Sequence, residues 1–501
     1  MKVLVLEHPR MASFDRFNDI ANAPLWSCLM GGYASSALEE EGMDVVFMDK
    51  ARPGATFEET EGEILALAPD LLCVNAVYFW EYTPRLFQSL SHLKTRGFSG
   101  HINLFGFFPT LIYRQILKEC SWVDSIAVGE FEFTLKELAR AIEKGRNPEK
   151  IQGLALASCL GDDLSRLRSP EKNPDIFAFP RRTHWKGTLS ILGSRGCYNQ
   201  CSFCPVPSFY NQGSLWRGRS PENIAREIQG LVDQGVTSFY FCDPNFIGPG
   251  ARGKRRTMEL MALIRPMNVR FGMETRPQDL DEELMESLVN AGFESLLMGI
   301  ESGSDHVLNR IDKASGPEWA ARAIDLCRAY GVEPEIGFLM FVPESRIEDL
   351  GINMDFLEKN RLLDRLDRTA NLLSHSLIVL AGTSGYDRYR AMGMLQPKGM
   401  FGFEGRVAFS DPKVAWVCEL LTFACHRLLR ASSHSGSPVF WKRPDPDVSR
   451  TANGFLVDLG RRLIEQAKDR AWDGHPKATE NRKTEIAARI DFLLSFGDFS
   501  G

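Results

Sequence analysis

The sequence contains no run of eighteen or more apolar residues, so it predicts no helix that spans a membrane. It also lacks an excess of positive charge, since 59 Lys and Arg stand against 65 Asp and Glu, for a formal net charge of −6. That balance argues against a nucleic-acid-binding protein that depends on bulk electrostatic attraction. The first residues, Met-Lys-Val-Leu-Val-Leu-Glu, reach a charge too early for a signal peptide and are expected to form a strand.

Cysteine is infrequent and unevenly distributed. There are 11 cysteines, an odd number, and most are scattered singly along the chain. This usage indicates a reducing compartment, and we expect a cytoplasmic protein. The sequence has no second cysteine pair that could complete a four-ligand zinc site with the one cysteine cluster it contains.

That cluster is the most informative stretch of the chain. Cys197, Cys201 and Cys204 follow one another at x3 and x2 spacing, just after the apolar run 188–192. Thiolates are the usual protein ligands of iron–sulfur clusters, which normally take four. The alternatives are a structural zinc site, which needs a fourth protein ligand, and unrelated core cysteines. The spacing therefore favours a [4Fe-4S] cluster held by three cysteines, with one iron open to another ligand.

Residues 1–145 predict an open, doubly wound parallel sheet of Rossmann-like type. Short apolar runs typical of buried strands alternate with helical patterns. Ligands of such sheets lie beyond the carboxyl ends of the strands. No Gly-x-Gly-x-x-Gly pattern is present there, which argues against a dinucleotide. The expected strands are 2–6, 44–48, 71–77, 102–106 and 125–129, with helices at 30–41, 84–96, 110–119 and 133–144.

Turn residues are frequent in residues 146–187, which we interpret as a linker. From residue 188 to 390, strands and helices alternate again, which predicts a partial (β/α)6 barrel of TIM type. Ser220 and Pro221 are expected to begin one of its helices, as N-cap and first-turn residue. The expected strands are 188–193, 237–242, 269–274, 295–300, 334–341 and 374–380.

Polar side chains follow several of these barrel strands. Barrel enzymes carry their chemistry at the carboxyl ends of the strands, so these residues are candidate ligand contacts. A helix N-terminus with an acidic cap would explain Ser302, but not several polar strand ends at once. The candidates are Asp243 and Asn245 after the second strand, Glu274 and Arg276 after the third, and Glu301 and Ser302 after the fourth.

Residues 391–501 predict a mostly helical region that caps the barrel and selects the substrate. The apolar stretch 410–430 and the segments 453–471 and 478–496 have helical patterns. His375, His426 and His434 are candidate substrate contacts, and each could equally be a structural histidine.

The motif Cys-x3-Cys-x2-Cys, with Phe203 before its last cysteine and Ser194-Arg195-Gly196 ahead of it, resembles the radical S-adenosylmethionine (radical SAM) superfamily. The resemblance implies that the open iron chelates S-adenosylmethionine. The cluster, reduced by a flavodoxin or ferredoxin, would then cleave this cofactor to a 5′-deoxyadenosyl radical. It implies that Phe203 and the polar strand-end residues contact S-adenosylmethionine, because Gly299-Ile-Glu301-Ser302-Gly303-Ser304 is similar to a stretch of the cobalamin-associated subgroup.

The N-terminal third resembles the cobalamin-binding domain that precedes many radical SAM cores. The matching pieces are Pro24-Leu25, Asp49, Gly106-Phe-Phe-Pro109-Thr110 and Gly129-Glu130-Phe-Glu132. An Asp-x-His-x-x-Gly motif is absent, which implies a cobalamin with its base displaced and no histidine on cobalt. Tyr78, Phe79 and Trp80 would lie under the corrin, or would form an apolar domain interface. The implied cobalamin contacts are Tyr78, Phe79, Gly106, Phe108, Pro109, Thr110, Gly129 and Glu130.

The resemblance implies a cobalamin-dependent radical enzyme that methylates an unactivated carbon of a small molecule of natural-product or lipid type, free or carrier-bound. Ring closure or rearrangement without methyl transfer is the alternative. Methylthiotransfer is disfavoured because Cys28, Cys73 and Cys120 do not match the three cluster cysteines of that family's first domain. A non-catalytic iron–sulfur protein would not require polar residues at several strand ends.

Overall fold

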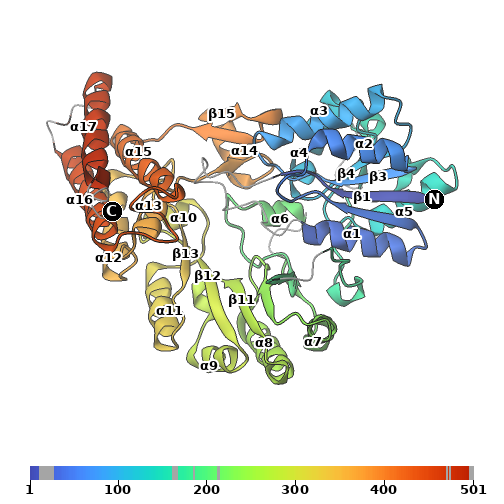
Figure 1. The fold of residues 1–501 in the computed structure, drawn as a ribbon, viewed down its shortest axis with the longest axis horizontal. Coiled ribbons are helices and arrows are strands. Elements are labelled where there is room, and N and C mark those ends of the chain that lie inside the picture. The colour runs from blue at the N-terminus through green and yellow to red at the C-terminus, as the bar shows by residue number, and fades with distance from the viewer. Residues whose placement is uncertain are drawn as a thin grey trace.

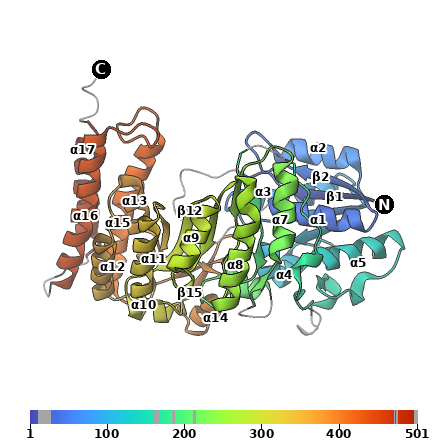
Figure 2. The ribbon, with the colours of Figure 1, turned by 90° about the horizontal axis from the view of Figure 1, so that it is seen from below.

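The computed structural model describes residues 1–10, 28–160, 167–183, 187–210, 215–469, 472 and 475–495. Pro24-Leu25, expected to contribute to a cobalamin site, lies outside the described residues. The N-terminal sheet occupies one end of the molecule, the C-terminal helices occupy the other, and the barrel strands lie between them (Figures 1 and 2).

The N-terminal sheet has the strand order β2-β1-β3-β4-β5-β6. The first five strands are parallel, which confirms the predicted doubly wound sheet, and β6 adds an antiparallel edge that the sequence did not predict. The strand order reverses between β1 and β3, where flavodoxin-like sheets bind their ligands. The strands are β1 Lys2–Glu7, β2 Asp44–Asp49, β3 Leu71–Asn75, β4 His101–Phe105, β5 Ser125–Ala127 and β6 Leu154–Ala155.

Helices cover both faces of this sheet, as the apolar character of its strands requires. On β1, Val3 and Val5 pack against α1 and α5, while Leu4 and Leu6 face α2, α3 and α4. The helices are α1 Cys28–Glu40, α2 Phe57–Leu67, α3 Tyr82–Thr95, α4 Phe107–Glu119 and α5 Glu132–Glu143.

The barrel contains a five-stranded parallel sheet in the order β13-β12-β11-β10-β7. Its outward side chains, such as Phe239 and Phe271, form a core with the surrounding helices. Helix α7 begins as predicted, with Ser220 accepting a hydrogen bond from Asn223 N. The strands are β7 Leu189–Ile191, β10 Ser238–Phe241, β11 Arg270–Thr275, β12 Phe293–Glu301 and β13 Glu335–Phe338. The helices include α7 Pro221–Val232, α8 Gly250–Ile264, α9 Glu282–Asn290, α10 Asp305–Arg310, α11 Pro317–Ala329 and α12 Ile347–Lys359.

The predicted sixth barrel strand, 374–380, is reduced to one parallel bridge between Phe341 and Ser376. Phe341 N donates to His375 O at 3.1 Å, and Leu377 N donates to Phe341 O at 2.8 Å. The following residues form β14 (Val379–Leu380), which joins a separate antiparallel sheet. Burial explains why the chain does not continue as a sixth barrel strand, because Val379 and Leu380 belong to the core of the N-terminal domain and not to that of the barrel.

Two strands lie within residues 395–407, in the region 391–501 that was expected to be mostly helical. Strands β15 (Leu395–Lys398) and β16 (Glu404–Val407) pair with β14 in a three-stranded sheet. Left-handed backbone at Gly399 and Gly402 makes the reversal between β15 and β16. This sheet lies against the N-terminal domain, as the orange segment in Figure 1 shows.

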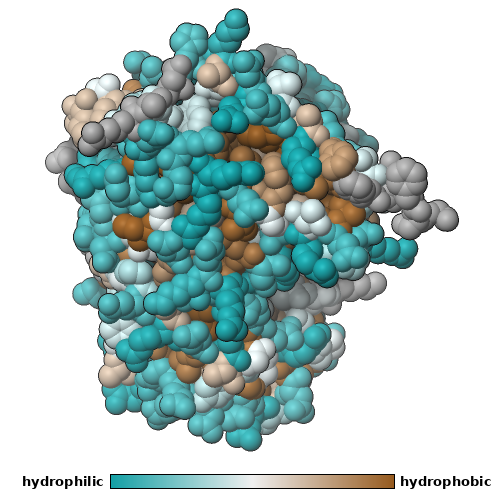
Figure 3. Space-filling view, turned by 90° about the vertical axis from the view of Figure 1, so that its left-hand side faces the viewer, coloured by the Kyte–Doolittle hydropathy of each residue, from teal (hydrophilic) through white to brown (hydrophobic). Residues whose placement is uncertain are grey.

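The rest of the C-terminal region is helical, as predicted. Helices α15 (Pro412–Ser433), α16 (Pro446–Lys468) and α17 (Pro476–Ser495) pack together, and α15 and α16 also pack on α13 (Leu366–Ser374) of the barrel region, so that they extend the barrel core. Figure 3 shows that this end of the molecule is covered mainly by hydrophilic residues, with hydrophobic ones towards the middle of the face. Among the described residues, no helix combines the length and the apolar character needed to cross a membrane.

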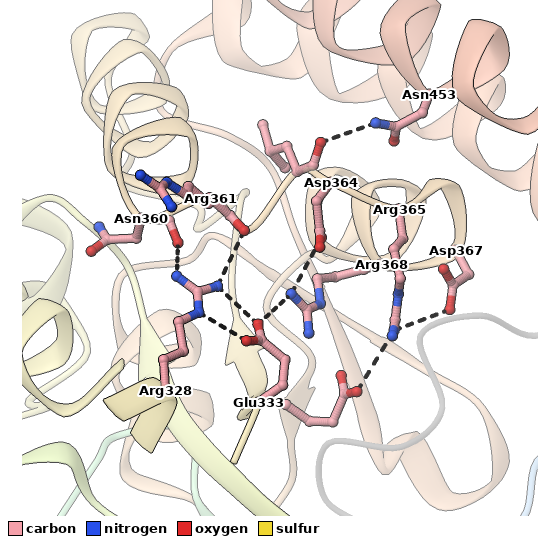
Figure 4. A network of polar contacts seen from close by, with 11 residues as sticks. Arg328, Glu333, Asn360, Arg361, Asp364, Arg365, Asp367, Arg368 and Asn453 are labelled. Atoms are coloured by element: carbon pink, nitrogen blue, oxygen red, sulfur yellow. Dashed lines mark hydrogen bonds and ion pairs between the residues drawn. The ribbon is translucent and has the colours of Figure 1, made fainter. Parts of the chain in front are cut away.

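An ion-pair network at the amino end of β13 joins the barrel to these helices (Figure 4). Glu333 accepts hydrogen bonds of 2.8 Å from both Arg328 and Arg368. The Arg328 hydrogen bond is the main reason that the pKa of Glu333 is lowered to about 2. Asn453 of α16 donates to Leu363 O at 3.0 Å, next to this network. Because it lies at the amino ends of the barrel strands, away from the carboxyl ends where barrel enzymes carry their chemistry, the network is expected to serve stability.

We expect Glu333→Gln to lower the melting temperature at pH 7 by roughly 2 °C, because the buried Arg368 loses the closer of its two carboxylate partners and keeps only Asp364 at 3.3 Å. The folded-state pKa of Glu333 is depressed, so its contribution is fully present above the ordinary value of 4.5 and is lost as the pH falls towards 2. The difference between wild type and variant should therefore shrink across that range. Glu294→Gln, which removes the exposed pair with Arg270, is the matched control. Equal melting temperatures of Glu333→Gln and wild type at pH 7 would contradict the stabilising role.

Candidate functional site

The three cysteines lie on one short segment, residues 196–204, which we call the cysteine loop. It follows β8 (Ser194–Arg195) and ends where Cys204 caps α6 (Pro205–Phe209). Gly196 has a φ of +79°, and a Cβ there would lie 1.8 Å from Leu215 O, so only glycine fits. The loop thus turns sharply just beyond the carboxyl end of β7, at the end of the barrel where chemistry is expected.

The thiols of the cysteine loop are free and partly buried. Burial raises the pKa of Cys204, and it raises that of Cys201 although Lys313 opposes the shift. In the described part of the chain, no three His, Cys, Asp or Glu side chains are arranged to hold one metal ion. Cluster cysteines bind different iron atoms and need not converge on one point. Three thiols on one anchored loop are therefore a donor set that fits a [4Fe-4S] cluster.

Residues 311–314, which follow α10, anchor the cysteine loop. The Asn199 side chain donates to Cys201 Sγ at 2.9 Å and to Lys313 O at 2.8 Å. Ser202 N donates to Ile311 O at 2.9 Å. From the end of β11, Arg276 donates to Lys313 O at 2.7 Å. The loop is therefore fixed beside the carboxyl ends of β11 and β12.

A buried ion pair lies at the end of β12. Lys313 Nζ is 2.8 Å from Glu301 Oε1. Burial alone would lower the pKa of Lys313, but the charge and hydrogen bond of Glu301, together with the nearby Cys201, outweigh it, and the pKa is raised. Glu301 has a φ of +70°, a left-handed conformation that costs on the order of 1 kcal/mol and is typical of functional sites.

Two glycines leave the inner face of the barrel open beside this pair. Gly299 and Gly337 are direct partners on β12 and β13. A Cβ on Gly299 would lie 2.7 Å from Glu301 Oε1 and 2.9 Å from Lys313 Nζ. The pair of glycines therefore lets a ligand or a neighbouring backbone approach the ion pair closely, which fits the expected cofactor site.

Asp243 follows β10, and Glu274 lies within the neighbouring strand β11, one residue before its end. Burial raises the pKa of Asp243 to about 6, and burial together with repulsion from Asp243 raises that of Glu274 to about 7. Asp243 accepts a hydrogen bond from Gly193 N at 2.9 Å. Its other oxygen, Oδ1, is buried and has no hydrogen-bond partner among the described residues. These carboxyls suit a ligand that brings a donor group, such as a protonated amine.

The other predicted S-adenosylmethionine contacts hold loops in place. Asn245 donates to Asp279 at 2.9 Å, and Arg276 holds residues 313 and 314. Ser302 is fully buried and donates to Asn353 at 2.7 Å. Phe203 packs against a small apolar cluster that includes Val307 and Leu339. Direct contact of these four residues with the cofactor stays a prediction.

The loops after β4 and β5 bring backbone close to the edge of the N-terminal sheet. Gly106 has a φ of +106°, and a Cβ there would lie 2.4 Å from Asn75 Oδ1. Gly129 has a φ of +77°, and its N–H donates to Thr110 Oγ1 at 3.0 Å. Pro109 lies beside Thr110 in the first turn of α4. The predicted residues from these two loops therefore lie together, and their small side chains fit a ligand that approaches the sheet edge.

Tyr78 and Phe108, two of the predicted aromatic contacts, lie at an apolar domain interface, which is the alternative that the sequence leaves open for residues 78–80. Tyr78 and Phe108 are buried, and each ring centroid lies 4.7 Å from that of Phe403 in the C-terminal three-stranded sheet. The Tyr78 hydroxyl also donates to Glu404. Phe79 N donates to Thr83 Oγ1 at 2.6 Å. Contact of these aromatic residues with a corrin stays a prediction.

Sequence reasoning missed a polar group at the reversal point between β1 and β3. Glu7 accepts hydrogen bonds from Arg10 at 2.6 Å and from Asn75 at 2.8 Å, and burial raises its pKa to about 7. Both ring nitrogens of His8 lie within 3.3 Å of backbone groups, and burial lowers its pKa to about 3, so the ring is neutral. Only β-strand pairing brings Glu7 and Asn75 together, so no local motif marks this group.

The N-terminal loops also touch the cysteine loop. Phe107 stacks on Phe209 of α6, with ring centroids 4.1 Å apart. Both rings belong to an apolar cluster that contacts Cys197 and Cys204. The carboxyl edges of the N-terminal sheet and of the barrel therefore face each other across the cysteine loop. Phe107 was overlooked although it lies within the run from Gly106 to Thr110.

The comparisons with known proteins agree with this geometry. Residues 191–357 match the model of the radical SAM superfamily. An uncharacterized methyltransferase of Pyrococcus horikoshii is 23% identical over 376 residues, which cover 72% of this chain and 78% of that protein. The anaerobic magnesium-protoporphyrin IX monomethyl ester cyclase of Rubrivivax gelatinosus is 26% identical over 355 residues, 65% of this chain and 60% of the cyclase. The match to 4′-phospho-dehydrooxetanocin synthase of Priestia megaterium, 24% identical over 67% of this chain, spans 49% of that enzyme.

Solved structures extend the likeness to nearly the whole chain. The cobalamin-dependent S-adenosylmethionine radical enzyme OxsB, with aqua-cobalamin and S-adenosylmethionine bound, superposes with a TM-score of 0.76 at 18% identity, covering 99% of this chain and 80% of OxsB. The radical S-adenosylmethionine methyltransferase TsrM from Kitasatospora setae has a TM-score of 0.64 at 18% identity, covering 97% of this chain and 99% of TsrM. The chain thus contains a radical SAM domain, in an overall fold that is that of the cobalamin-dependent radical SAM enzymes OxsB and TsrM.

Proposed function

We propose that this protein is a cobalamin-dependent radical SAM enzyme that methylates an unactivated carbon of a small molecule. The observation that carries the proposal is the meeting of two carboxyl edges, of the N-terminal sheet and of the barrel, at the cysteine loop. Parallel sheets bind ligands at these edges, so two cofactors bound there would share one reaction space. The fold likeness to OxsB and TsrM supports the same reading.

Cys197, Cys201 and Cys204 would hold the [4Fe-4S] cluster, which supplies the electron that cleaves S-adenosylmethionine. The chain's own contribution is to fix the geometry. Asn199 holds Cys201 against residues 312 and 313, and Gly299 and Gly337 keep space beside the Glu301–Lys313 pair. This pair presents one charge of each sign to a zwitterionic ligand. Asp243 and Glu274, with pKa values raised to about 6 and about 7, would accept hydrogen bonds from its amino group.

We assign cobalamin, which would supply the methyl group, to the edge of the N-terminal sheet. Gly106, Thr110 and Gly129 would bring backbone and small side chains against it. Both ring nitrogens of His8 are engaged by backbone groups, which supports a cobalt without a histidine ligand. Contacts from Tyr78, Phe79, Phe108, Pro109 and Glu130 belong to the same proposal.

The substrate would enter between the barrel and the C-terminal helices. His375 follows α13 and lies beside Ser376, which bridges the last barrel strand. Burial lowers the pKa of His375, so its ring is neutral and can accept as well as donate a hydrogen bond. A small reducing protein of flavodoxin or ferredoxin type would deliver electrons from outside.

Ring closure or rearrangement without methyl transfer is the second candidate. The 26% identity to a relative named as a cyclase favours it. The mass of the product distinguishes the two, because methylation adds one CH2 unit and rearrangement adds nothing.

The first test is anaerobic reconstitution with iron, sulfide and hydroxocobalamin, followed by removal of unbound material and metal analysis. We expect four irons and one cobalt per chain, and iron loss in Cys201→Ala because two thiols cannot hold the cluster. Cys159→Ala, which removes a free cysteine far along the chain from the loop, is the control and should keep its iron. A reconstituted wild-type protein with iron but without cobalt would contradict the methyl-transfer proposal. Full iron content in Cys201→Ala would contradict the assignment of the cluster to the cysteine loop.

Glu301→Gln should weaken S-adenosylmethionine binding roughly tenfold, because Lys313 stays buried without its counter-charge. Iron content should not change, since the hydrogen bonds that hold the cysteine loop come from Asn199, Ser202 and Arg276 to residues 311–314 and do not use the Glu301 side chain. Glu335→Gln, on the neighbouring strand at the opposite end of the barrel, is the matched control. Binding is measured by anaerobic titration calorimetry on the reconstituted protein. Unchanged affinity in Glu301→Gln would place the cofactor elsewhere.

Gly106→Ala should reduce cobalt retention several-fold and leave iron unchanged. The added Cβ would collide with Asn75 Oδ1 at 2.4 Å and would strain a backbone with φ of +106°. Gly97→Ala is the matched control, because Gly97 also has a left-handed backbone, with a φ of +91°, but has open space around it. Cobalt and iron are counted after reconstitution of each variant. Equal cobalt loss in both glycine variants would show a stability effect, and the loop after β4 would lose its assignment.

A further inference from the structure

Four buried charged side chains connect the N-terminal domain to the start of the cysteine loop. We call them the clasp: Glu130 and Glu132 from the N-terminal domain, and Arg195 and Arg217 from the barrel region. Their exposed fractions are 7%, 2%, 5% and 6%, respectively. Glu130 follows β5 and Glu132 begins α5, while Arg195 lies on β8 and Arg217 on β9 (Arg217–Gly218). The sequence predicted Glu130 as a cobalamin contact and gave no role to Arg217.

One guanidinium bridges both carboxylates. Arg195 Nη1 lies 3.2 Å from Glu130 Oε1, and Arg195 Nη2 lies 2.5 Å from Glu132 Oε1. Arg217 reaches the same Glu130 carboxylate from the other side, at 2.8 Å to Oε1 and 3.0 Å to Oε2. The backbone N–H of Glu171 also donates a hydrogen bond to Glu130 Oε2 at 2.7 Å. Both oxygens of Glu130 are therefore occupied by groups from outside its own domain.

The clasp compensates a repulsion within the barrel region. Arg195 and Arg217 are direct cross-strand partners in the antiparallel pair of β8 and β9. Like charges in that position destabilise a strand pair. Here the opposing carboxylates are supplied by the N-terminal domain. The β8–β9 pair, which leads directly into Gly196 and Cys197, therefore depends on that domain for its charge balance.

Aromatic rings fix the orientation of both guanidinium groups. Arg195 lies over Phe177 at 3.8 Å and over Tyr33 at 5.1 Å, measured to the ring centroids. Arg217 lies over Tyr210 at 4.9 Å. A planar guanidinium held between rings can direct two hydrogen-bonding edges at once, which a lysine cannot do. The geometry therefore specifies arginine at position 195.

Buried ion pairs of this kind fix the relative position of the elements they join more than they stabilise the fold. Desolvation offsets most of the attraction of a buried ion pair, and an apolar replacement of similar volume is often as stable. Burial alone would raise the pKa of Glu130, but Arg195, Arg217 and the hydrogen bond from Glu171 N together outweigh it, and the pKa is lowered. The carboxylate thus stays ionised and the clasp stays closed at neutral pH. Compared with apolar packing, the clasp holds the β8–β9 pair in a single position relative to the N-terminal domain.

The clasp and the Phe107–Phe209 stack hold opposite ends of the cysteine loop. Arg195 lies two positions before Cys197, and Phe209 lies five positions after Cys204. Both anchors end on loops of the N-terminal domain, those after β5 and β4. We propose that Glu130, Glu132, Arg195 and Arg217 are positioning residues that set the place of the cysteine loop relative to the N-terminal sheet edge. Only the purpose of this placement, alignment of two cofactors, rests on the proposed function.

Hydrogen–deuterium exchange on the apoprotein tests the clasp without any cofactor. In Glu132→Gln, Arg195 loses one of its two carboxylates, so amides in residues 194–204 and 215–219 should exchange roughly tenfold faster. Amides in β1 and β3 should keep their wild-type rates. Glu137→Gln is the matched control, because Glu137 lies on the same helix and pairs with Arg168 away from the loop. Glu132→Asp, which shortens the side chain and keeps the charge, serves if Glu132→Gln does not fold.

The outcomes separate a positioning role from general stability. Faster exchange confined to the two segments supports the clasp. Unchanged exchange there in both Glu132 variants would overturn it, and so would acceleration spread evenly over the whole chain. Arg195→Lys keeps the positive charge but cannot bridge two carboxylates. Amides in the same two segments should therefore also exchange faster in this variant than in wild type.

Reconstituted protein distinguishes failure of the clasp from failure of the proposed function. In Glu132→Gln with full iron, the electron paramagnetic resonance signal of the reduced cluster should broaden on addition of S-adenosylmethionine, relative to Glu137→Gln. Identical signals in the two variants would count against the clasp. Absence of cobalt in wild type, together with the expected exchange pattern, would overturn cobalamin dependence and leave the clasp intact.

Discussion

The cysteine loop can bind a cluster in one geometry only if its backbone is fixed by other elements. It has almost no secondary structure of its own, and its positions are set by hydrogen bonds from Asn199 and Ser202 to residues 311–313. The loop begins at Gly196, which has a left-handed backbone, and it ends at Cys204, where the first turn of α6 begins. The arrangement of the barrel rim and of the N-terminal loops follows from this one anchored segment.

Burial of charge is the second theme of the site. Lys313 with Glu301, and Arg195 with Glu130, are buried, as is Asp243, while its neighbour Glu274 is partly buried. The first two pairs are compensated by opposite charge, whereas burial raises the pKa values of Asp243 and Glu274 to about 6 and about 7. Ionisable groups are buried here at a cost in stability that the large apolar cores around both sheets can support.

The C-terminal region completes both domains. Its three-stranded sheet covers the aromatic side chains of the N-terminal domain, and its helices extend the barrel core. The chain therefore returns from the barrel to the first domain before it forms the terminal helices (Figure 1). A substrate bound between these parts would contact residues from three distant segments, which explains why the sequence alone does not identify it.

Local sequence patterns determined the parts that depend on neighbouring residues. Strand and helix periodicity predicted β1 to β5, and the spacing of Cys197, Cys201 and Cys204 indicated the cluster. Strand-end polarity placed Glu301, Asp243 and Glu274 at the rim. Each of these signals lies within a few residues of chain, where periodicity and spacing act.

Tertiary structure decided what depends on distant partners. Only the folded chain brings Glu130 to Arg195, Tyr78 to Phe403, and Ser302 to Asn353. The expected sixth strand became a single bridge because Val379 and Leu380 find a better-buried place in another core. Long-range burial and charge compensation override local propensity at such points, since their free energy comes from contacts that no short window of sequence contains.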